Sequence, residues 1–459
     1  MSFEKDYNLY PDVEKRPDWE EYCKELWVEV RQSIEEGLDI GKYKDLIYAV
    51  HALENNQHKA ELAEVIWNIV KTAEIKEGYK YNEPSDLEGI KALRKPYEFK
   101  SEYPKDKEAL REKISGAWYG RICGCLLGKP VEGMKYNELK PFLEETGNAP
   151  MHRYIMNTDV TDEVAAKYKF KLKGRCYPDN IECAPWDDDT NYMVIAQILV
   201  NQYGRDFTPY DVSRVWLARQ PKDSYCTAER VAIRNFIEGY LPPVSAVYKN
   251  PYREWIGAQI RGDYFGYINP GNPELAAEMA WRDASISHIK NGIYGEMFVS
   301  AMIACAAVTD NIKDIIYGGL AQIPATSRLY EQVVRLINRF DEGVTQEECF
   351  ADIHAVWNDM SGHDWCHTIS NALIVVAALL YGNGDYSKSI CMAVETGFDT
   401  DCNGATVGSI IGMRNGEKGI DEYWKAPTHG ILDTTVFGAS KSEISKMVDN
   451  TMPHIPEVK

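Results

Sequence analysis

The stretch that decides the fold is GAWYGRICGCLLG, residues 116–128, in which glycine stands at every fourth position. Residues four apart lie on the same face of an α-helix, so these glycines line one helix face. Each interior glycine costs a helix about 1 kcal/mol relative to alanine. The row therefore predicts that another backbone approaches this face closely. A second row with the same spacing, at Gly404, Gly408 and Gly412, predicts the same for a second helix.

The remainder of the chain after residue 105 is also predominantly helical in pattern. Alternating strand patterns with hairpin turns are scarce, whereas apolar helical stretches recur and are rich in small residues. We expect helices at Gly116–Leu127, Tyr192–Val200, Gly295–Val308, Ser370–Leu380 and Ala405–Ile411. The sequence thus predicts an all-α fold, with irregular segments at 151–183 and 242–273 that could border a pocket.

Residues 1–105 form a separate helical N-terminal extension in this interpretation, and residues 106–459 form the main domain. Apolar residues recur at three- and four-residue spacing within 22–40, 41–57 and 59–75. A polar, proline-containing stretch places a linker near residues 80–107. The extension carries no pattern typical of catalysis, so we expect a scaffold or a partner surface there.

The overall charge limits the possible partners. The 459-residue chain has a formal net charge of −19, which argues against a nucleic-acid backbone as the main partner but leaves room for a small anionic ligand. No apolar run approaches the length of a membrane span, and no apolar leader follows Met1. The eleven cysteines show no repeated CxxC pattern and are interpreted as reduced thiols of a cytoplasmic protein. The oligomeric state stays open.

Two acidic clusters precede small-residue helical stretches. The first is PWDDDTNYM, which contains Asp187, Asp188 and Asp189, and the second is GFDTDCNGATVGSIIG, which contains Asp399 and Asp401. Helix N-termini favour aspartate, so two independent solvated caps are one interpretation. Carboxylates cut into apolar sequence need positive charge when buried, and hard divalent cations take such oxygen ligands. The pair of clusters therefore favours a metal site.

Together with GAWYGRICGCLLGKPVEGM, these clusters form three motifs in an order that resembles the ADP-ribosylglycohydrolase family. The resemblance covers roughly residues 110–425 and includes no counterpart of the N-terminal extension. It implies an all-α domain with two divalent cations, Mg²⁺ or Mn²⁺, held between helix ends. The metal ligands implied by the motif positions are Asp187, Asp188, Asp189, Asp399, Asp401 and Cys402. The catalytic residues implied are Glu132, Asp187, Asp189 and Asp401, with Glu132 or Asp187 moving protons.

Three positions depart from the family pattern. Cys125 stands where the early motif has an aspartate, and Asp187 and Cys402 each replace a hydroxyl ligand. A thiol is a soft ligand that suits Mg²⁺ poorly. A further interpretation is therefore that the metal site has degenerated and that the protein is a structural relative of the family without its activity.

Candidate substrate-binding residues are Glu132, Arg261, Asp263, His288 and His367. Arg261 suits a phosphate and the neighbouring aromatics Tyr264, Phe265 and Tyr267 could stack on a base, although a surface loop tied by an Arg–Asp pair fits equally. The resemblance places a Ser/Thr-His segment near the substrate, which favours His288 with Asp283 as its partner, against a buried histidine bonded to backbone. His363 and His367 stand at i and i+4, but the pattern lacks the glutamate of a helical zinc motif, so zinc is disfavoured there.

The resulting hypothesis is a metal-dependent hydrolase of a ribosyl glycosidic bond in an ADP-ribosyl compound, protein-linked or free. A non-catalytic binder of ADP-ribose or a nucleotide, or a structural relative, is the second hypothesis. A hydrolase of another nucleoside or N-glycoside is the third. No GxGxxG, P-loop or G-x-S-x-G motif supports a nucleotide fold or a serine hydrolase.

Overall fold

The two glycine rows face each other at the centre of the molecule. They lie on α6 (Lys107–Gly128) and α21 (Thr400–Asn415), which run antiparallel in the computed structural model, whose description covers residue 7 and residues 9–456. A Cβ atom built on Gly120 would lie 2.1 Å from the Gly408 carbonyl oxygen, and one on Gly124 would lie 2.0 Å from the Gly404 oxygen. The two backbones are therefore in direct contact, which confirms the close approach that the spacing predicts.

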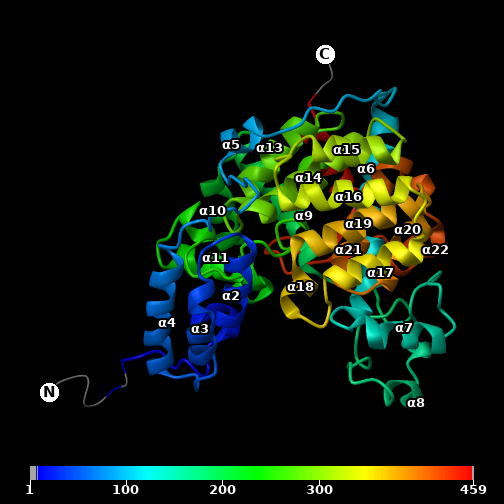
Figure 1. Cartoon of the computed structure of the whole chain (residues 1–459). Helices are drawn as coiled ribbons and strands as arrows, with labels where there is room; N and C mark the ends of the chain where they lie inside the picture. The colour runs from blue at the N-terminus through cyan, green and yellow to red at the C-terminus, as the bar shows by residue number, and fades with distance from the viewer. Residues whose placement is uncertain (1–6, 8, 457–459) are drawn as a thin grey trace.

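The remaining α-helices make up the rest of the molecule (Figure 1). They are α2 (Leu26–Glu35), α3 (Lys44–His51), α4 (Gln57–Val70), α5 (Leu87–Ala92), α7 (Tyr136–Glu145), α8 (Asp162–Ala165), α9 (Asp188–Tyr203), α10 (Pro209–Arg219), α11 (Thr227–Ile237), α12 (Asp263–Tyr267), α13 (Pro273–Ala284), α14 (Lys290–Ala306), α15 (Ile312–Leu320), α16 (Arg328–Asp341), α17 (Gln346–Val356), α18 (Gly362–Cys366), α19 (Thr368–Gly382), α20 (Tyr386–Glu395), α22 (Glu422–Lys425) and α23 (Ile444–Thr451). Every helix expected from the periodicity is present, and the fold is all-α.

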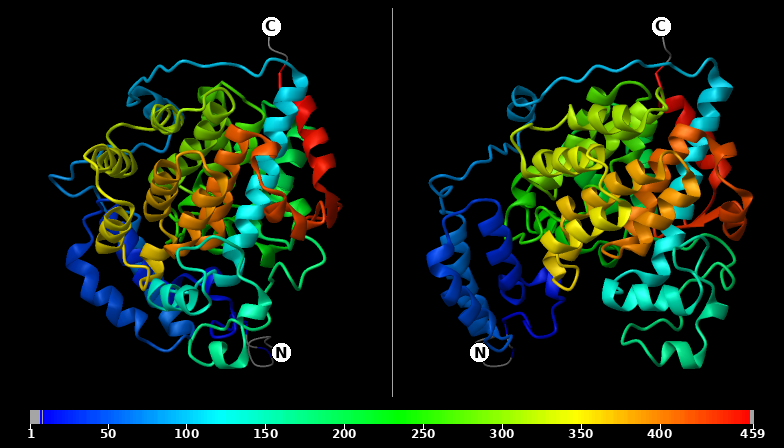
Figure 2. Two further views of the ribbon diagram at one scale, coloured as in Figure 1. Left: turned by 90° about the vertical axis from the view of Figure 1, so that its right-hand side faces the viewer. Right: turned by 45° about the vertical axis from the view of Figure 1, so that its right-hand side comes forward.

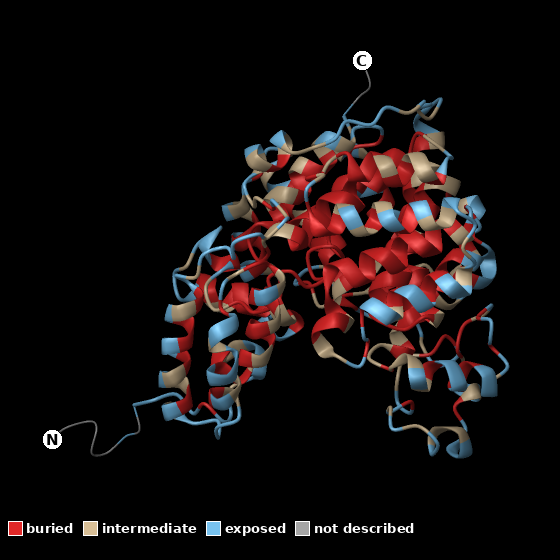
Figure 3. Cartoon of the chain, viewed as in Figure 1, coloured by how far each residue is buried: buried red, intermediate tan, exposed pale blue. Residues whose placement is uncertain are grey.

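Helices α9, α14, α19 and α21 form the buried centre (Figure 3). They are apolar or small on nearly every face, which is the pattern of a helix surrounded by protein. The amphipathic helix α16 instead lies at the surface, with its apolar face turned inward and its other face exposed (Figure 3). Because α9 and α21 are buried along most of their length, the acidic residues at their N-termini are also drawn into the core.

A short two-stranded sheet holds the chain just before α9. Strands β1 (Ile431–Asp433) and β2 (Lys441–Glu443) pair antiparallel. Ala184 joins the edge of β1, because its N–H donates to the Ile431 carbonyl at 3.0 Å and its carbonyl accepts from the Asp433 N–H at 2.9 Å. This pairing fixes the entry of the chain into the first acidic cluster.

Helices α2, α3 and α4 pack around a small hydrophobic core of their own at one side of the molecule (Figure 2). The segment that follows runs across the surface of the main helices, where the Glu102 N–H donates to the Val308 carbonyl at 2.7 Å and the ring of Tyr97 stacks on Tyr317 at 5.1 Å. The segment expected to be a linker, near residues 80–107, is therefore held against the main domain by specific contacts. Among the described residues, no helix is both long and apolar enough to cross a membrane.

The helix contact generates a stability prediction. Gly120→Ala places a methyl group against the Gly408 backbone, which cannot move without shifting α21, so we expect it to lower the free energy of unfolding by about 2–3 kcal/mol. Gly41→Ala is the matched control, because a Cβ there meets nothing within 4 Å. Chemical denaturation of both variants provides the measurement. Equal stabilities for the two would contradict the contact.

Candidate metal centre

Asp187 caps α9, whereas Asp399 does not use its side chain to cap α21. The Asp187 Oδ1 accepts a hydrogen bond from the Asp189 N–H at 3.1 Å, and the Thr190 hydroxyl donates to the Asp187 carbonyl at 3.1 Å. At α21, the N-terminal residue Asp399 makes no such side-chain bond. Side-chain capping therefore explains the position of one of the five aspartates, and the positions of the other four need another explanation.

The two helix starts meet, and their carboxylates converge. One ligand atom from each of Asp187, Asp188, Asp189 and Asp401 lies within 4.8 Å of the others, and the same holds for Asp189, Asp401 and Cys402. Asp189 is fully buried and Asp401 is 2% exposed. Among the described residues, Asp189 Oδ2 and Asp401 Oδ1 have no hydrogen-bond partner. Two unpartnered buried carboxylate oxygens side by side are costly, and a divalent cation between them would remove the cost.

The electrostatics of the cluster agree with this geometry. Burial, and then repulsion from Glu132 and Asp187, raises the pKa of Asp401 well above its usual value. Burial also raises the pKa of Asp399, to about 6. A group of acids that resists ionisation in this way is stabilised by added positive charge. The donor set, mostly carboxylate oxygen, fits Mg²⁺ or Mn²⁺.

Arg121 on α6 and Lys129, the residue that follows this helix, supply two positive charges to the cluster. Arg121, Cys125 and Lys129 are spaced by four residues and so share a face. Both guanidinium ends of Arg121 are bound, one to Asp189 Oδ1 at 2.8 Å and the other to Asp263 Oδ2 at 2.7 Å. The Lys129 Nζ lies 2.5 Å from Asp187 Oδ2. Neither base was identified from the sequence, although two cations on one face of an otherwise apolar, glycine-lined helix were a usable signal.

The two thiols in the motifs are both buried beside the acids. Burial, and then repulsion from Asp187 and Asp189, raises the pKa of Cys125 well above its usual value. Burial and the repulsion of Asp189 act in the same direction on Cys402. Both groups are therefore neutral thiols, and of the two only Cys402 belongs to a group with metal-binding geometry.

The open side of the cluster carries Glu132 and Trp186. The Glu132 side chain is 42% exposed, and Trp186 is exposed beside Asp187. Burial by the surrounding protein, and then repulsion from Asp187 and Asp399, raises the pKa of Glu132 to about 7. Arg175, from the irregular segment 151–183, donates to the Glu132 carbonyl at 3.2 Å. That segment therefore borders the site.

Of three comparisons with known proteins, a scan against family models agrees with these motifs. A family model described as ADP-ribosylglycohydrolase matches residues 106–456. The chain belongs to the ADP-ribosylglycohydrolase family. A search of curated proteins finds no match. A solved structure titled "ADP-ribosylglycohydrolase-related protein complex" is similar over 75% of this chain and 97% of its own, with 14% sequence identity and a TM-score of 0.42.

Within the ADP-ribosylglycohydrolase domain, Arg261 and Asp263 lie in the interior. The Arg261 guanidinium binds Glu229 Oε1 at 2.9 Å and Ser287 Oγ at 2.8 Å and also pairs with Asp283. Asp263 accepts from Arg121 and is fully buried. Neither side chain is exposed, and the substrate-binding role expected for them stays a prediction. Each of the two buried charges has an opposite charge beside it, because burial without a partner is costly.

The aromatic residues around Asp263 lie in the interior as well. Tyr264, Phe265 and Tyr267 are fully buried, with the Tyr267 hydroxyl 2.7 Å from Ser409 Oγ. They pack between α9, α14 and α6 and offer no face on which a base could stack. Most of the segment 242–273 is therefore interior structure, and its glycines and aromatics serve packing.

His288 is also buried, at the far end of the Arg261 network. Its Nδ1 lies 2.8 Å from Ser287 Oγ, whose hydroxyl also accepts from Arg261. Among the described residues its Nε2 has no partner. Asp283 binds Arg261 and not His288, so the expected Asp283–His288 pair does not form. The structure brings Glu132 and the acidic clusters together, and it leaves His288 outside them.

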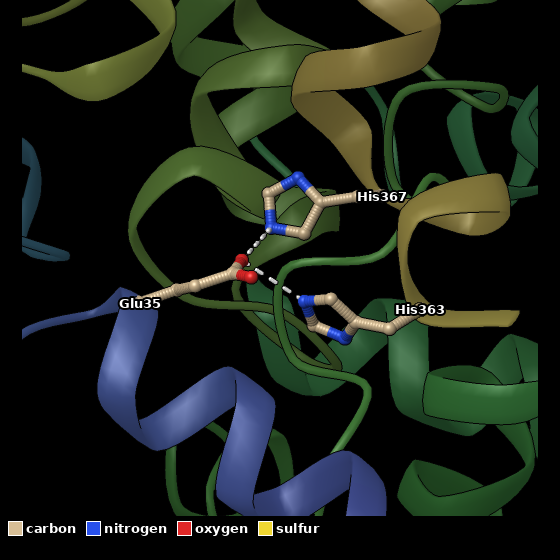
Figure 4. A group of neighbouring side chains, drawn as sticks. All are labelled: Glu35, His363 and His367. Carbon is tan, nitrogen blue, oxygen red and sulfur yellow. Dashed lines mark hydrogen bonds and ion pairs between the residues drawn. The ribbon is translucent and has the colours of Figure 1, made fainter. Parts of the chain in front are cut away.

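His367 and His363 converge on Glu35, which comes from α2 (Figure 4). The Glu35 Oε2 lies 3.0 Å from His363 Nε2 and 3.8 Å from His367 Nε2. The glutamate absent from the local motif is thus supplied from more than 300 residues away. His367 is fully buried, and its expected position at the substrate stays a prediction.

Zinc is nevertheless disfavoured at these three residues by the hydrogen bonds to the other ring nitrogens. The Trp255 Nε1–H donates to His363 Nδ1 at 3.1 Å, and the Ile369 N–H donates to His367 Nδ1 at 3.1 Å. Each Nδ1 is therefore an acceptor, so each neutral ring carries its proton on Nε2, which points at Glu35. A metal on Nε2 would need the proton on Nδ1, where a donor already stands.

The buried position of His367 generates a pH prediction. Burial lowers the pKa of His367 to about 3, far below the value of about 6.5 in an unfolded chain. At a pH between these two values, only the unfolded state binds the proton. The contribution of His367 to the free energy of unfolding is therefore complete above pH 6.5. It falls by about 1.4 kcal/mol per pH unit as the pH drops toward 3.

The variant His367→Asn tests this, because asparagine keeps an acceptor for the Ile369 N–H but does not titrate. Urea unfolding at several pH values between 4 and 6.5, with EDTA present, should give a slope of stability against pH that is smaller by about one proton. An identical slope for the variant and the parent chain would show that His367 is protonated in the folded state.

Proposed function

We propose that this protein is a metal-dependent hydrolase that cleaves a ribosyl glycosidic bond in an ADP-ribosyl compound, protein-linked or free. The observation that carries the proposal is the pair of unpartnered, buried oxygens Asp189 Oδ2 and Asp401 Oδ1, at the meeting point of two helix N-termini. Membership of the ADP-ribosylglycohydrolase family supports hydrolysis of a glycosidic bond. The open side at Glu132 and Trp186 supports access by a substrate.

The cations would be held by carboxylates from both helix starts, namely Asp187, Asp188, Asp189 and Asp401, with the Cys402 thiol beside Asp189 and Asp401. Asp399, which starts the same helix as Asp401, is a further candidate ligand from the family motif but belongs to neither of these converging groups. When bound, a divalent cation lowers the pKa of water and orients the hydroxyls of a sugar. Arg121 holds Asp189 Oδ1 in place and thereby leaves Oδ2 directed into the cluster. The chain's own contribution is thus a pre-arranged set of oxygens.

The proton-transfer role falls to Glu132 and not to Asp187. A pKa of about 7 suits a general acid or base at neutral pH. For Asp187, the ammonium of Lys129 outweighs the opposing effect of burial and lowers the pKa, so Asp187 stays ionised. Hydrolysis forms a bond from the water oxygen to the anomeric carbon, breaks the bond to the leaving group, and moves one proton from the water to that group. Glu132 would carry this proton.

The assay that tests the proposal uses peptides carrying ADP-ribosyl-arginine and ADP-ribosyl-serine, with Mg²⁺ or Mn²⁺ and with EDTA. We expect turnover that EDTA abolishes and added metal restores. Turnover in EDTA would contradict the metal mechanism. Metal-dependent binding of ADP-ribose without turnover would favour a binding protein. Cleavage of other nucleosides or N-glycosides, but not of these peptides, would redirect the substrate class.

Asp401→Asn should weaken Mn²⁺ binding about 10- to 100-fold, because Asp401 belongs to both sets of converging ligand atoms and the change removes its negative charge. Isothermal calorimetry gives the affinity, and Asp352→Asn, at an exposed position on α17, is the matched control. Unchanged Mn²⁺ affinity in Asp401→Asn would remove this residue from the site.

Lys129 should compete with a cation for Asp187. Its ammonium already neutralises Asp187 Oδ2, so Lys129→Met should tighten Mn²⁺ binding by about tenfold, which is about 1.4 kcal/mol. The exposed Lys42→Met serves as a control for the loss of one surface charge. Weaker Mn²⁺ binding in Lys129→Met would show that the lysine supports the cation instead of competing with it.

A further inference from the structure

We infer that helix α2 of the N-terminal region positions a metal-binding turn of the main domain, and that Arg31 and Glu35 thereby set the affinity of the acidic cluster for its cation. The inference rests on the proposed function, because it assumes that the cluster binds a cation. Both residues lie outside the part of the chain that matches the family. They are positioning residues, since neither touches the cluster.

Side chains of helix α2 contact three consecutive residues at the start of α18, Gly362, His363 and Asp364. Arg31 Nη2 lies 2.6 Å from Asp364 Oδ1, and Glu35 Oε2 accepts from His363 Nε2–H at 3.0 Å (Figure 4). The ring of Trp27 lies against Gly362, where an added Cβ would be 3.3 Å from it. The Asp364 carboxylate is nearly buried, at 8% exposure, so its ion pair is screened less than a surface pair.

The other end of α18 holds the turn that leads into α21. The Trp365 Nε1–H donates to the Phe398 carbonyl at 2.6 Å, and Cys366 Sγ lies 3.8 Å from Asp399 Oδ2. Asn371 adds a bridge, because its amide donates to the Trp365 carbonyl at 2.9 Å and its oxygen accepts from the Asp399 N–H at 3.2 Å. Displacement of α18 would therefore move Asp399.

The turn needs such support because its backbone is strained. Gly397 has φ of +78° and Phe398 has φ of +59°. A bulky residue in the left-handed region is unfavourable and persists only where its surroundings hold it. Asp399, which follows at once, has no capping bond of its own at α21. Its orientation consequently depends on what α18 supplies.

Helix α2 can act as a brace because it is anchored independently of α18. Arg253 Nη2 lies 2.9 Å from Glu29 Oε1 and pairs with Glu36, and the Gln32 amide donates to Glu254 Oε2 at 2.6 Å. These groups are buried. The anchoring contacts and the bracing contacts thus use different residues of one helix, which makes them separable by mutation.

The experiment measures Mn²⁺ affinity by calorimetry on the full chain, together with thermal stability. Arg31→Met combined with Glu35→Ala should weaken Mn²⁺ binding about three- to tenfold, less than the loss typical of groups that touch a metal ligand directly. Arg31→Lys combined with Glu35→Gln should restore most of the affinity, because it keeps a cation for Asp364 and an acceptor for His363. Lys59→Ala, the matched control in the same N-terminal region but outside α2, loses the hydrogen bonds of a buried side chain to the His51 carbonyl and Asn55 Oδ1, so it should lower the melting temperature and leave Mn²⁺ affinity unchanged.

A double-mutant cycle with Trp365→Phe identifies the route. That variant removes the bond to the Phe398 carbonyl, so its effect on Mn²⁺ affinity should not add to the effect of the Arg31 and Glu35 changes. The inference is overturned if the parent chain binds Mn²⁺ and the Arg31→Met, Glu35→Ala chain binds it equally well, or if Lys59→Ala weakens Mn²⁺ binding as much. A parent chain that binds no Mn²⁺ overturns the proposed function, and the inference with it.

Discussion

The contact between the backbones of α6 and α21 is the constraint on which the rest of the structure depends. Because neither helix carries a side chain at the crossing, Gly120 meets Gly408 and Gly128 meets the Thr400 carbonyl. The last turn of α6 therefore ends against the first turn of α21. This places Lys129 beside the acids that start α21 and α9, and it puts the face that carries Arg121 next to Asp189. A wider crossing would separate the bases from the acids.

The charge balance of the site follows from that placement. Arg121 and Lys129 bind one oxygen each of Asp189 and Asp187, and they leave Asp189 Oδ2 and Asp401 Oδ1 without partners among the described residues. Partial neutralisation of this kind keeps the acids together in the folded chain while leaving a position for added positive charge. The same principle explains Arg261, whose complete set of partners leaves nothing for a ligand.

Local patterns indicate which acids lie together where the residues are close in sequence. The triple aspartate and Asp401 lie side by side, because each acidic cluster starts an apolar helix whose burial carries the acids inward. Arg261 and His367 were expected at the substrate and are buried instead. A sequence pattern reports that a residue is polar, but the number of its buried partners depends on segments far away. Glu35 illustrates this point, since it completes a group with two histidines more than 300 residues later.

The sequence by itself determined the helical class, the close approach of two glycine-lined helices and the acidic character of their N-termini, because periodicity and capping act within a few residues. Only the tertiary structure decided that the two glycine rows face each other, that Lys129 and Arg121 enter the acidic cluster, and that α2 reaches α18. Those outcomes depend on which surfaces are complementary across long separations. Packing and the pairing of buried charges choose among arrangements that local sequence leaves equally possible.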